Sequence, residues 1–124
     1  MNIPVNLHYT RDHEWVKIEG NQATVGITDF AQNQLGDIVF VDIQTEGEHI
    51  DVSEAFGTIE AVKTVADILM PLSGTVTQVN PELDESPQLV NTDPYGEGWM
   101  IKIDLSNLDE VNDLLTAEAY KEAL

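Results

Sequence analysis

Lys63 is the side chain whose type and surroundings offer the clearest chemistry in this sequence. It is one of only four lysines, and with Thr64 it separates two stretches that favour β-structure, Gly57–Val62 and Val65–Met70. Two strands that meet here place the lysine amine at the tip of a hairpin, where it projects into solvent. Most lysines are simply solvated, but this one stands within a mainly apolar hairpin, which makes its amine the candidate functional group.

Other reactive residue types do not form recognisable sites. His8, His13 and His49 lack the spacing of a metal site, so no metal is expected. Gly96 and Gly98 lack the following lysine and helix of a phosphate loop, and no serine stands in a nucleophile motif. Cysteine is absent, so any redox or thiol chemistry must come from a group added to the protein.

Size and charge restrict the class of protein. The 124 residues correspond to one domain, residues 1–124, with no room for a separate catalytic domain, so we do not expect an enzyme. Asp and Glu total 23 against 5 Lys and Arg, a formal net charge of −18. Such a surface repels nucleic acid and anionic membranes. Its expected partners are proteins with basic docking surfaces.

The N-terminal segment has neither a basic lead nor an apolar signal core, and no apolar run approaches the length of a membrane span. Because Met1 lies close to the first expected strand, a bacterial start codon is the simpler explanation. We therefore expect a cytoplasmic bacterial protein, or a mitochondrial-matrix protein if a presequence has been removed.

Short strands separated by turn residues dominate the chain and indicate a mostly β fold. Gly20 and Asn21 suit the tight turn of a first hairpin. Thr28 is expected to cap a short helix that runs through Leu35 and stops at Gly36. The expected strands are Glu14–Glu19, Gln22–Ile27, Ile38–Ile43, Phe56–Val62, Val65–Met70, Thr75–Val79 and Trp99–Ile103.

A C-terminal helix completes the expected elements. Ser106 and Asp109 resemble a capping box at its start. Leu108, Val111 and Leu115 fall on one helical face, which predicts that this helix lies against the sheets.

The segment Phe56–Gly74 (FGTIEAVKTVADILMPLSG) resembles the lipoyl-attachment hairpin of the glycine cleavage system H proteins. The resemblance extends in order from about Tyr9 to Tyr120. It implies a barrel-sandwich hybrid of the lipoyl and biotinyl carrier type, with the lysine hairpin at one end of two sheets, a short helix after the first hairpin and a C-terminal helix. The other similar blocks are Tyr9–Gly20 (YTRDHEWVKIEG), Ala23–Ile43 (ATVGITDFAQNQLGDIVFVDI), Gln88–Trp99 (QLVNTDPYGEGW) and Ala117–Lys121 (AEAYK).

The resemblance implies a carrier rather than an enzyme. A lipoylating enzyme would attach lipoate to Lys63 as N6-lipoyllysine, giving a long tether that visits several active sites. A pyridoxal-phosphate glycine decarboxylase would load an aminomethyl group from glycine onto the arm. An aminomethyltransferase would pass the one-carbon unit to tetrahydrofolate, and dihydrolipoamide dehydrogenase would reoxidise the dithiol.

Three carboxylates are candidates for holding the loaded arm. Glu14 lies in a family-like block, and Asp67 is four residues beyond Lys63 on the returning strand. If they flank a groove, they could bind the protonated amine of the cargo and shield it from water. Asp12 is a third candidate, although in so acidic a protein most carboxylates serve only solubility.

Two alternatives keep the same fold. One is a lipoyl donor or relay that supplies lipoate to other enzymes, which the sequence does not separate from the glycine-cleavage role. The other is a biotin carrier, whose attachment lysine is usually bracketed by methionines. Here Val62 and Thr64 bracket Lys63, which favours lipoate.

Overall fold

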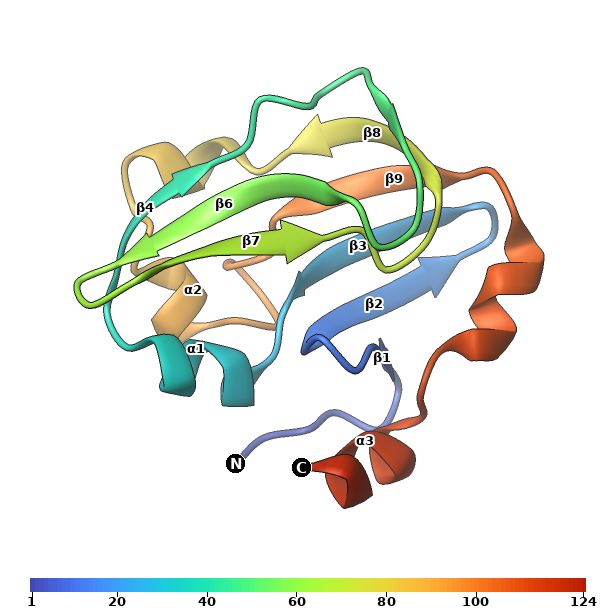
Figure 1. Ribbon diagram of the computed structural model, residues 1–124, viewed down its shortest axis with the longest axis horizontal. Helices are drawn as coiled ribbons and strands as arrows, with labels where there is room; N and C mark the ends of the chain where they lie inside the picture. The colour runs from blue at the N-terminus through green and yellow to red at the C-terminus, as the bar shows by residue number, and fades with distance from the viewer.

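The computed structural model describes residues 1–124 and contains two antiparallel β-sheets that face each other (Figure 1). This arrangement confirms the expected mostly β fold of the barrel-sandwich hybrid type. The larger sheet has six strands in the order β1 (His8–Tyr9), β2 (Glu14–Glu19), β3 (Gln22–Ile27), β9 (Ile101–Leu105), β8 (Gly74–Val79) and β5 (His49–Ile50). The smaller sheet has three strands in the order β4 (Ile38–Asp42), β6 (Ala55–Ala61) and β7 (Val65–Leu69).

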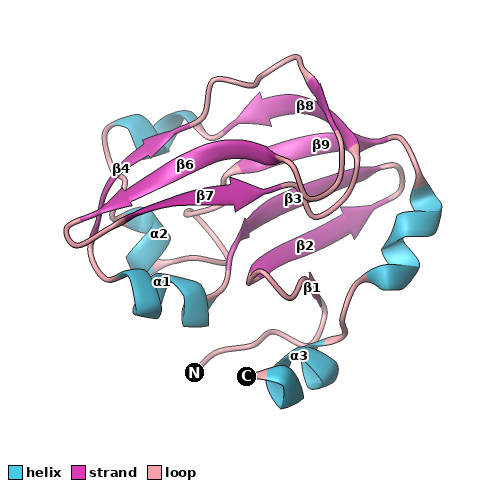
Figure 2. Cartoon of the chain, in the orientation of Figure 1, coloured by secondary structure: helices cyan, strands magenta, loops and turns pink.

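The helices are short and lie around the sheets (Figure 2). In Figure 1, α1 lies at the same end of the molecule as the turn between β6 and β7, and α3 lies beside both chain termini. The helical segments are α1 (Asp29–Leu35), η1 (Pro81–Asp84), α2 (Leu89–Thr92), η2 (Leu108–Asp113) and α3 (Ala117–Ala123).

A buried cluster of 19 apolar side chains forms the main hydrophobic core. In β6, a bulge near the start of the strand shifts the usual alternation, so that Phe56, Ile59 and Ala61 are all buried. Their burial fixes β6 up to Ala61, two residues before Lys63. The hairpin therefore leaves the core only at its tip.

The first hairpin and the helix after it have the predicted bounds. Gly20 adopts a φ of 65° in the turn between β2 and β3, a conformation that favours glycine. The Thr28 hydroxyl accepts a hydrogen bond of 3.2 Å from the Ala31 N–H, and Gly36 ends α1 with a φ of 80°. The capping residues predicted for this helix are thus confirmed.

The predicted strand at Trp99–Ile103 was wrong at both ends, because β9 begins at Ile101 and continues to Leu105. The Trp99 N–H donates to the Gly96 carbonyl at 3.1 Å, which makes Trp99 the end of a turn rather than the start of a strand. The bounds of the other predicted strands agree with the structure to within one residue.

The predicted capping box at Ser106 was also wrong. The Ser106 N–H donates to the Ser73 carbonyl, and the side chain of Asn107 caps a 3-10 helix, η2, instead. Leu108 is 50% exposed and does not share a buried face with Val111. A C-terminal α-helix is present, but it is α3, which Thr116 caps.

Gly74 shows how closely β8 and β9 approach. A Cβ added at Gly74 would overlap the backbone carbonyl oxygen of Asp104, which no side-chain rotation relieves. We expect Gly74→Ala to lower the free energy of unfolding by about 1 to 3 kcal/mol, since overpacked sites lose that much. Urea unfolding followed by circular dichroism measures this, with Thr75→Ala as the neighbouring control. Equal urea midpoints for parent and Gly74→Ala would contradict the steric argument.

Candidate functional site

Lys63 lies at the tip of the β6–β7 hairpin and is exposed. The Ala61 N–H donates to the Thr64 carbonyl at 2.8 Å and closes the turn. The Val62 N–H donates to the carbonyl of Asp37 at 3.1 Å, which ties the tip to the segment after α1. Lys63 therefore lies in a turn whose backbone is hydrogen-bonded both across the hairpin and to the segment after α1.

The Lys63 side chain passes close to the C-terminal end of α1. A Cβ added at Gly36 would lie 3.9 Å from the Lys63 Cε. Because α1 also carries residues that line a neighbouring cavity, the lysine and this cavity share one helix as a boundary.

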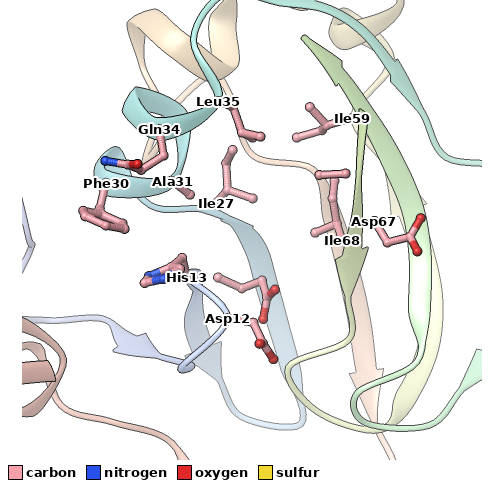
Figure 3. Close-up of a pocket in the computed structure, with 12 residues that line it drawn as sticks. Asp12, His13, Ile27, Phe30, Ala31, Gln34, Leu35, Ile59, Asp67 and Ile68 are labelled. Carbon is pink, nitrogen blue, oxygen red and sulfur yellow. The ribbon is translucent and has the colours of Figure 1, made fainter. Parts of the chain in front are cut away.

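The cavity has a volume of about 300 Å³ and opens beside α1, β2 and β7 (Figure 3). Its wall is mostly apolar, and its acidic residues come from two segments of the chain, residues 12–14 and β7. The residues that line it are Asp12, His13, Glu14, Ile27, Phe30, Ala31, Gln34, Leu35, Ile59, Ala66, Asp67 and Ile68. All three acidic residues predicted from the sequence thus belong to the lining of one cavity.

Glu14 is the buried carboxyl group of this cavity, with 3% of the residue exposed. The Thr10 hydroxyl donates to its Oε1 at 2.6 Å. The pKa of Glu14 is raised to about 7, chiefly by burial. The hydrogen bonds from Thr10 and the Leu69 backbone oppose the rise, and the nearby Asp12 carboxylate adds to it. The group therefore titrates near neutral pH.

Asp12 and Asp67 differ from Glu14 because both are exposed. On β7, Asp67 pairs with Thr58 and lies next to the buried Ile68 in sequence, so the two neighbouring side chains point to opposite faces of the strand. Figure 3 shows the Asp67 carboxylate directed away from His13 and Asp12. Asp67 is consequently a residue of the cavity's rim, and Glu14 belongs to its interior.

His13 is a cavity residue whose role the sequence did not reveal. Its Nδ1 and the Tyr120 hydroxyl share a hydrogen bond of 2.8 Å, and the same hydroxyl shares another of 2.8 Å with Thr28 Oγ1. The His13 ring also lies 4.7 Å from the Phe30 ring, between centroids. Burial lowers the pKa of His13, so the ring is neutral at neutral pH.

The sequence offered no direct signal for this cluster, because His13 and Tyr120 are 107 positions apart. The one local signal concerns Thr10, which stands four residues before Glu14 and can reach it with a hydroxyl. His13 adopts a φ of 68°, which is unusual for a residue other than glycine. This conformation becomes visible only in the folded chain.

Neither metal ligation nor ion pairing characterises this site. No group of three or more histidine, aspartate or glutamate side chains is arranged to hold a metal ion. The single ion pair joins His49 and Asp51, outside the cavity. None of the helices has the length and apolar character needed to cross a membrane.

Comparison with known proteins identifies the family of this chain. The family description of the glycine cleavage H-protein matches residues 7–124. The chain belongs to the glycine cleavage H-protein family. Membership of this family supports a lipoyl-carrier role in the glycine cleavage system.

Individual members of the family are similar over nearly their whole length. A glycine cleavage system H protein of Bacteroides fragilis is 58% identical over 121 residues, covering 98% of this chain and 96% of the relative. That of Salinibacter ruber is 55% identical over 122 residues, covering 98% of both. The crystal structure of a glycine cleavage system H protein from Mycobacterium marinum matches with a TM-score of 0.88 and 38% identity, covering 98% of this chain and 100% of that one.

The buried Glu14 gives stability a defined pH dependence. Its pKa is raised from 4.5 to about 7 in the folded protein, so the unfolded chain releases this proton at lower pH. The stability that the Glu14 proton contributes to the fold is therefore fully present below pH 4.5 and is lost as the pH rises through 7. Glu14→Gln does not ionise and escapes this loss.

We expect the free energy of unfolding of Glu14→Gln, relative to the parent, to increase by about 2 kcal/mol between pH 5 and pH 8. Urea unfolding at both pH values measures the difference. Glu19→Gln, on the exposed end of the same strand, should show no such change. A pH-independent difference for Glu14→Gln would mean that Glu14 titrates as it does in the unfolded chain.

Proposed function

We propose that this protein, as a single lipoyl-carrier domain of residues 1–124, shuttles the aminomethyl group of glycine on a lipoyl arm attached to Lys63. The cargo would pass from glycine decarboxylase to aminomethyltransferase, and dihydrolipoamide dehydrogenase would restore the arm. Chemistry at the substrate belongs to these separate enzymes, and the chain itself is non-catalytic. Its family membership and the exposed lysine support this role.

The residues around Lys63 fit a lipoyl group. Lys63 would hold it through an amide bond, and the bound group supplies a disulfide that opens to accept cargo. Ala66, which lines the cavity, is three residues from Lys63, a span of at most about 10 Å even for an extended chain. A lysine side chain extended by an octanoyl-derived chain is longer than this. Apolar side chains, including Phe30 and Leu35, offer a matching wall for such a chain.

The burial of Glu14 is the observation that favours a carrier of an amine cargo. Burying a carboxyl group in an apolar cavity is unfavourable, and a neutral lipoyl arm gives no electrostatic compensation. The protonated amine of the loaded arm compensates for this burial through a charge-assisted hydrogen bond. Asp12 and Asp67 add negative potential at the rim. The arm of a lipoyl relay carries no amine, so these carboxylates would not stabilise it.

Charge and relatives support the partners and the compartment. The net charge of −18 would steer the protein onto basic surfaces of the three enzymes and of the lipoylating enzyme. The relatives from Bacteroides fragilis and Salinibacter ruber are bacterial proteins, which supports a bacterial cytoplasmic carrier.

Lys63→Arg tests the attachment site. A guanidinium at an exposed tip disturbs few contacts but does not accept the lipoyl group. We expect an unchanged circular dichroism spectrum and urea midpoint, together with complete loss of the mass increase that lipoylation produces. Lys17→Arg, an exposed lysine on β2, is the matched control and should be lipoylated like the parent. Lipoylation of Lys63→Arg on another lysine would disprove the assignment.

Carboxylate-to-amide variants test cargo docking. Because a charge-assisted hydrogen bond contributes about 1.5 to 3 kcal/mol, we expect Glu14→Gln to release formaldehyde and ammonia from purified, aminomethyl-loaded protein roughly tenfold faster than the parent. Asp67→Asn should have a smaller effect because solvent screens its exposed carboxylate. Glu19→Gln serves as the control. Equal release from all four proteins would leave the carrier role intact but remove the docking role of these carboxylates.

A further inference from the structure

The Glu14 carboxyl group has no cationic partner in the folded protein. Only 3% of the Glu14 residue is exposed, and its side-chain hydrogen bond comes from the neutral Thr10 hydroxyl. None of the residues lining the cavity is a lysine or an arginine. A carboxylate in such a place lacks both water and a counter-charge, which favours its protonated form.

The titratable groups around Glu14 do not change this balance. Asp12, which precedes β2, acts on Glu14 as a negative charge, and Asp67, on β7, contributes an anionic group at the rim whose carboxylate is directed away from Asp12 and His13. His13 is neutral because its ring is partly buried, and its Nδ1 is engaged with Tyr120 from α3. Helix α1 contributes Gln34, which is uncharged, and apolar side chains. Every neighbouring element therefore supplies a neutral or anionic group.

We propose that the cavity exchanges a proton for its cargo: the protonated amine of the loaded arm enters, and Glu14 releases its proton to solvent. This exchange rests on the proposed docking of the aminomethyl-loaded arm. The charges balance, because a neutral carboxylic acid and an ammonium group become a carboxylate–ammonium pair and one released proton. No covalent bond of the arm is made or broken.

The exchange makes docking depend on pH. In the empty cavity, burial places the pKa of Glu14 at about 7, and an ammonium group in contact with it lowers that pKa. Between the two values, docking releases one proton, so its equilibrium constant falls tenfold for each unit of pH below 7. Above pH 7 the carboxylate is already ionised and docking reaches its limiting strength. Protonation of His13 in acid adds a cation to the cavity and acts in the same direction.

The direct test is a titration of the Glu14 side chain by NMR in full-length, lipoylated protein with ¹³C-labelled glutamate. The Glu14 carboxyl resonance is assigned by its loss in Glu14→Gln. The titration is carried out with the arm oxidised and with the arm aminomethyl-loaded. We expect a midpoint near pH 7 for the oxidised arm, and a midpoint at least one pH unit lower for the loaded arm, which corresponds to a tenfold effect on docking.

The Glu19 resonance is the internal control, since Glu19 is exposed at the far end of β2 and does not line the cavity. His13→Asn separates the two titrating groups, because asparagine tolerates the left-handed backbone conformation of this position. The Glu14 midpoints of this variant should still differ between the two forms by at least one unit.

The possible results separate the exchange from the docking on which it rests. A Glu14 midpoint near 4.5 with the oxidised arm would overturn the exchange, even if Glu14→Gln loses its cargo faster. A midpoint near 7 that is the same in both forms would overturn the docking of cargo on Glu14. In the release assay, the rate ratio of Glu14→Gln to parent should fall towards one as the pH is lowered from 8 to 6; a constant ratio above one would also overturn the exchange.

Discussion

The two sheets bury their facing sides against each other, and this constraint determines where the Lys63 turn and the cavity lie. Phe56, Ile59 and Ala61 anchor β6 in the core, and Ile68 anchors β7. Once these side chains are buried, the residues that follow Ala61 have no core to enter, and the chain must turn in solvent. Lys63 is exposed for this reason, while the hydrogen bond from the Val62 N–H to Asp37 keeps the turn beside α1.

The same constraint creates the cavity, because the sheets and α1 do not fill the space beside β2. A cavity lined by apolar residues suits an acyl chain, but the buried Glu14 carboxyl group weakens the fold at neutral pH. Natural proteins retain such groups at functional sites, where a perturbed pKa serves the chemistry. The opposite pKa shifts of Glu14 and His13 have one common cause, which is burial in the wall of this cavity.

Helix α3 connects the end of the chain to the cavity. The Tyr120 hydroxyl joins His13 on one side to Thr28, the cap of α1, on the other. The Tyr120 ring also stacks on Tyr9, with centroids 4.8 Å apart. The position of α1, and with it the cavity wall, thus depends on a residue that lies almost at the C-terminus.

Local signals in the sequence determined most of the secondary structure and the exposed position of Lys63. Alternating apolar residues, the Gly20 turn and the Thr28 cap depend on neighbours in sequence, so the hairpins, α1 and the tip position of Lys63 were predicted correctly. The cap at Ser106 failed because the Ser106 N–H bonds to Ser73, far away in the sequence. Tertiary structure alone buried Glu14, left Asp67 at the rim and brought His13 to Tyr120, because burial, and the pKa shifts that follow from it, depend on contacts between distant segments.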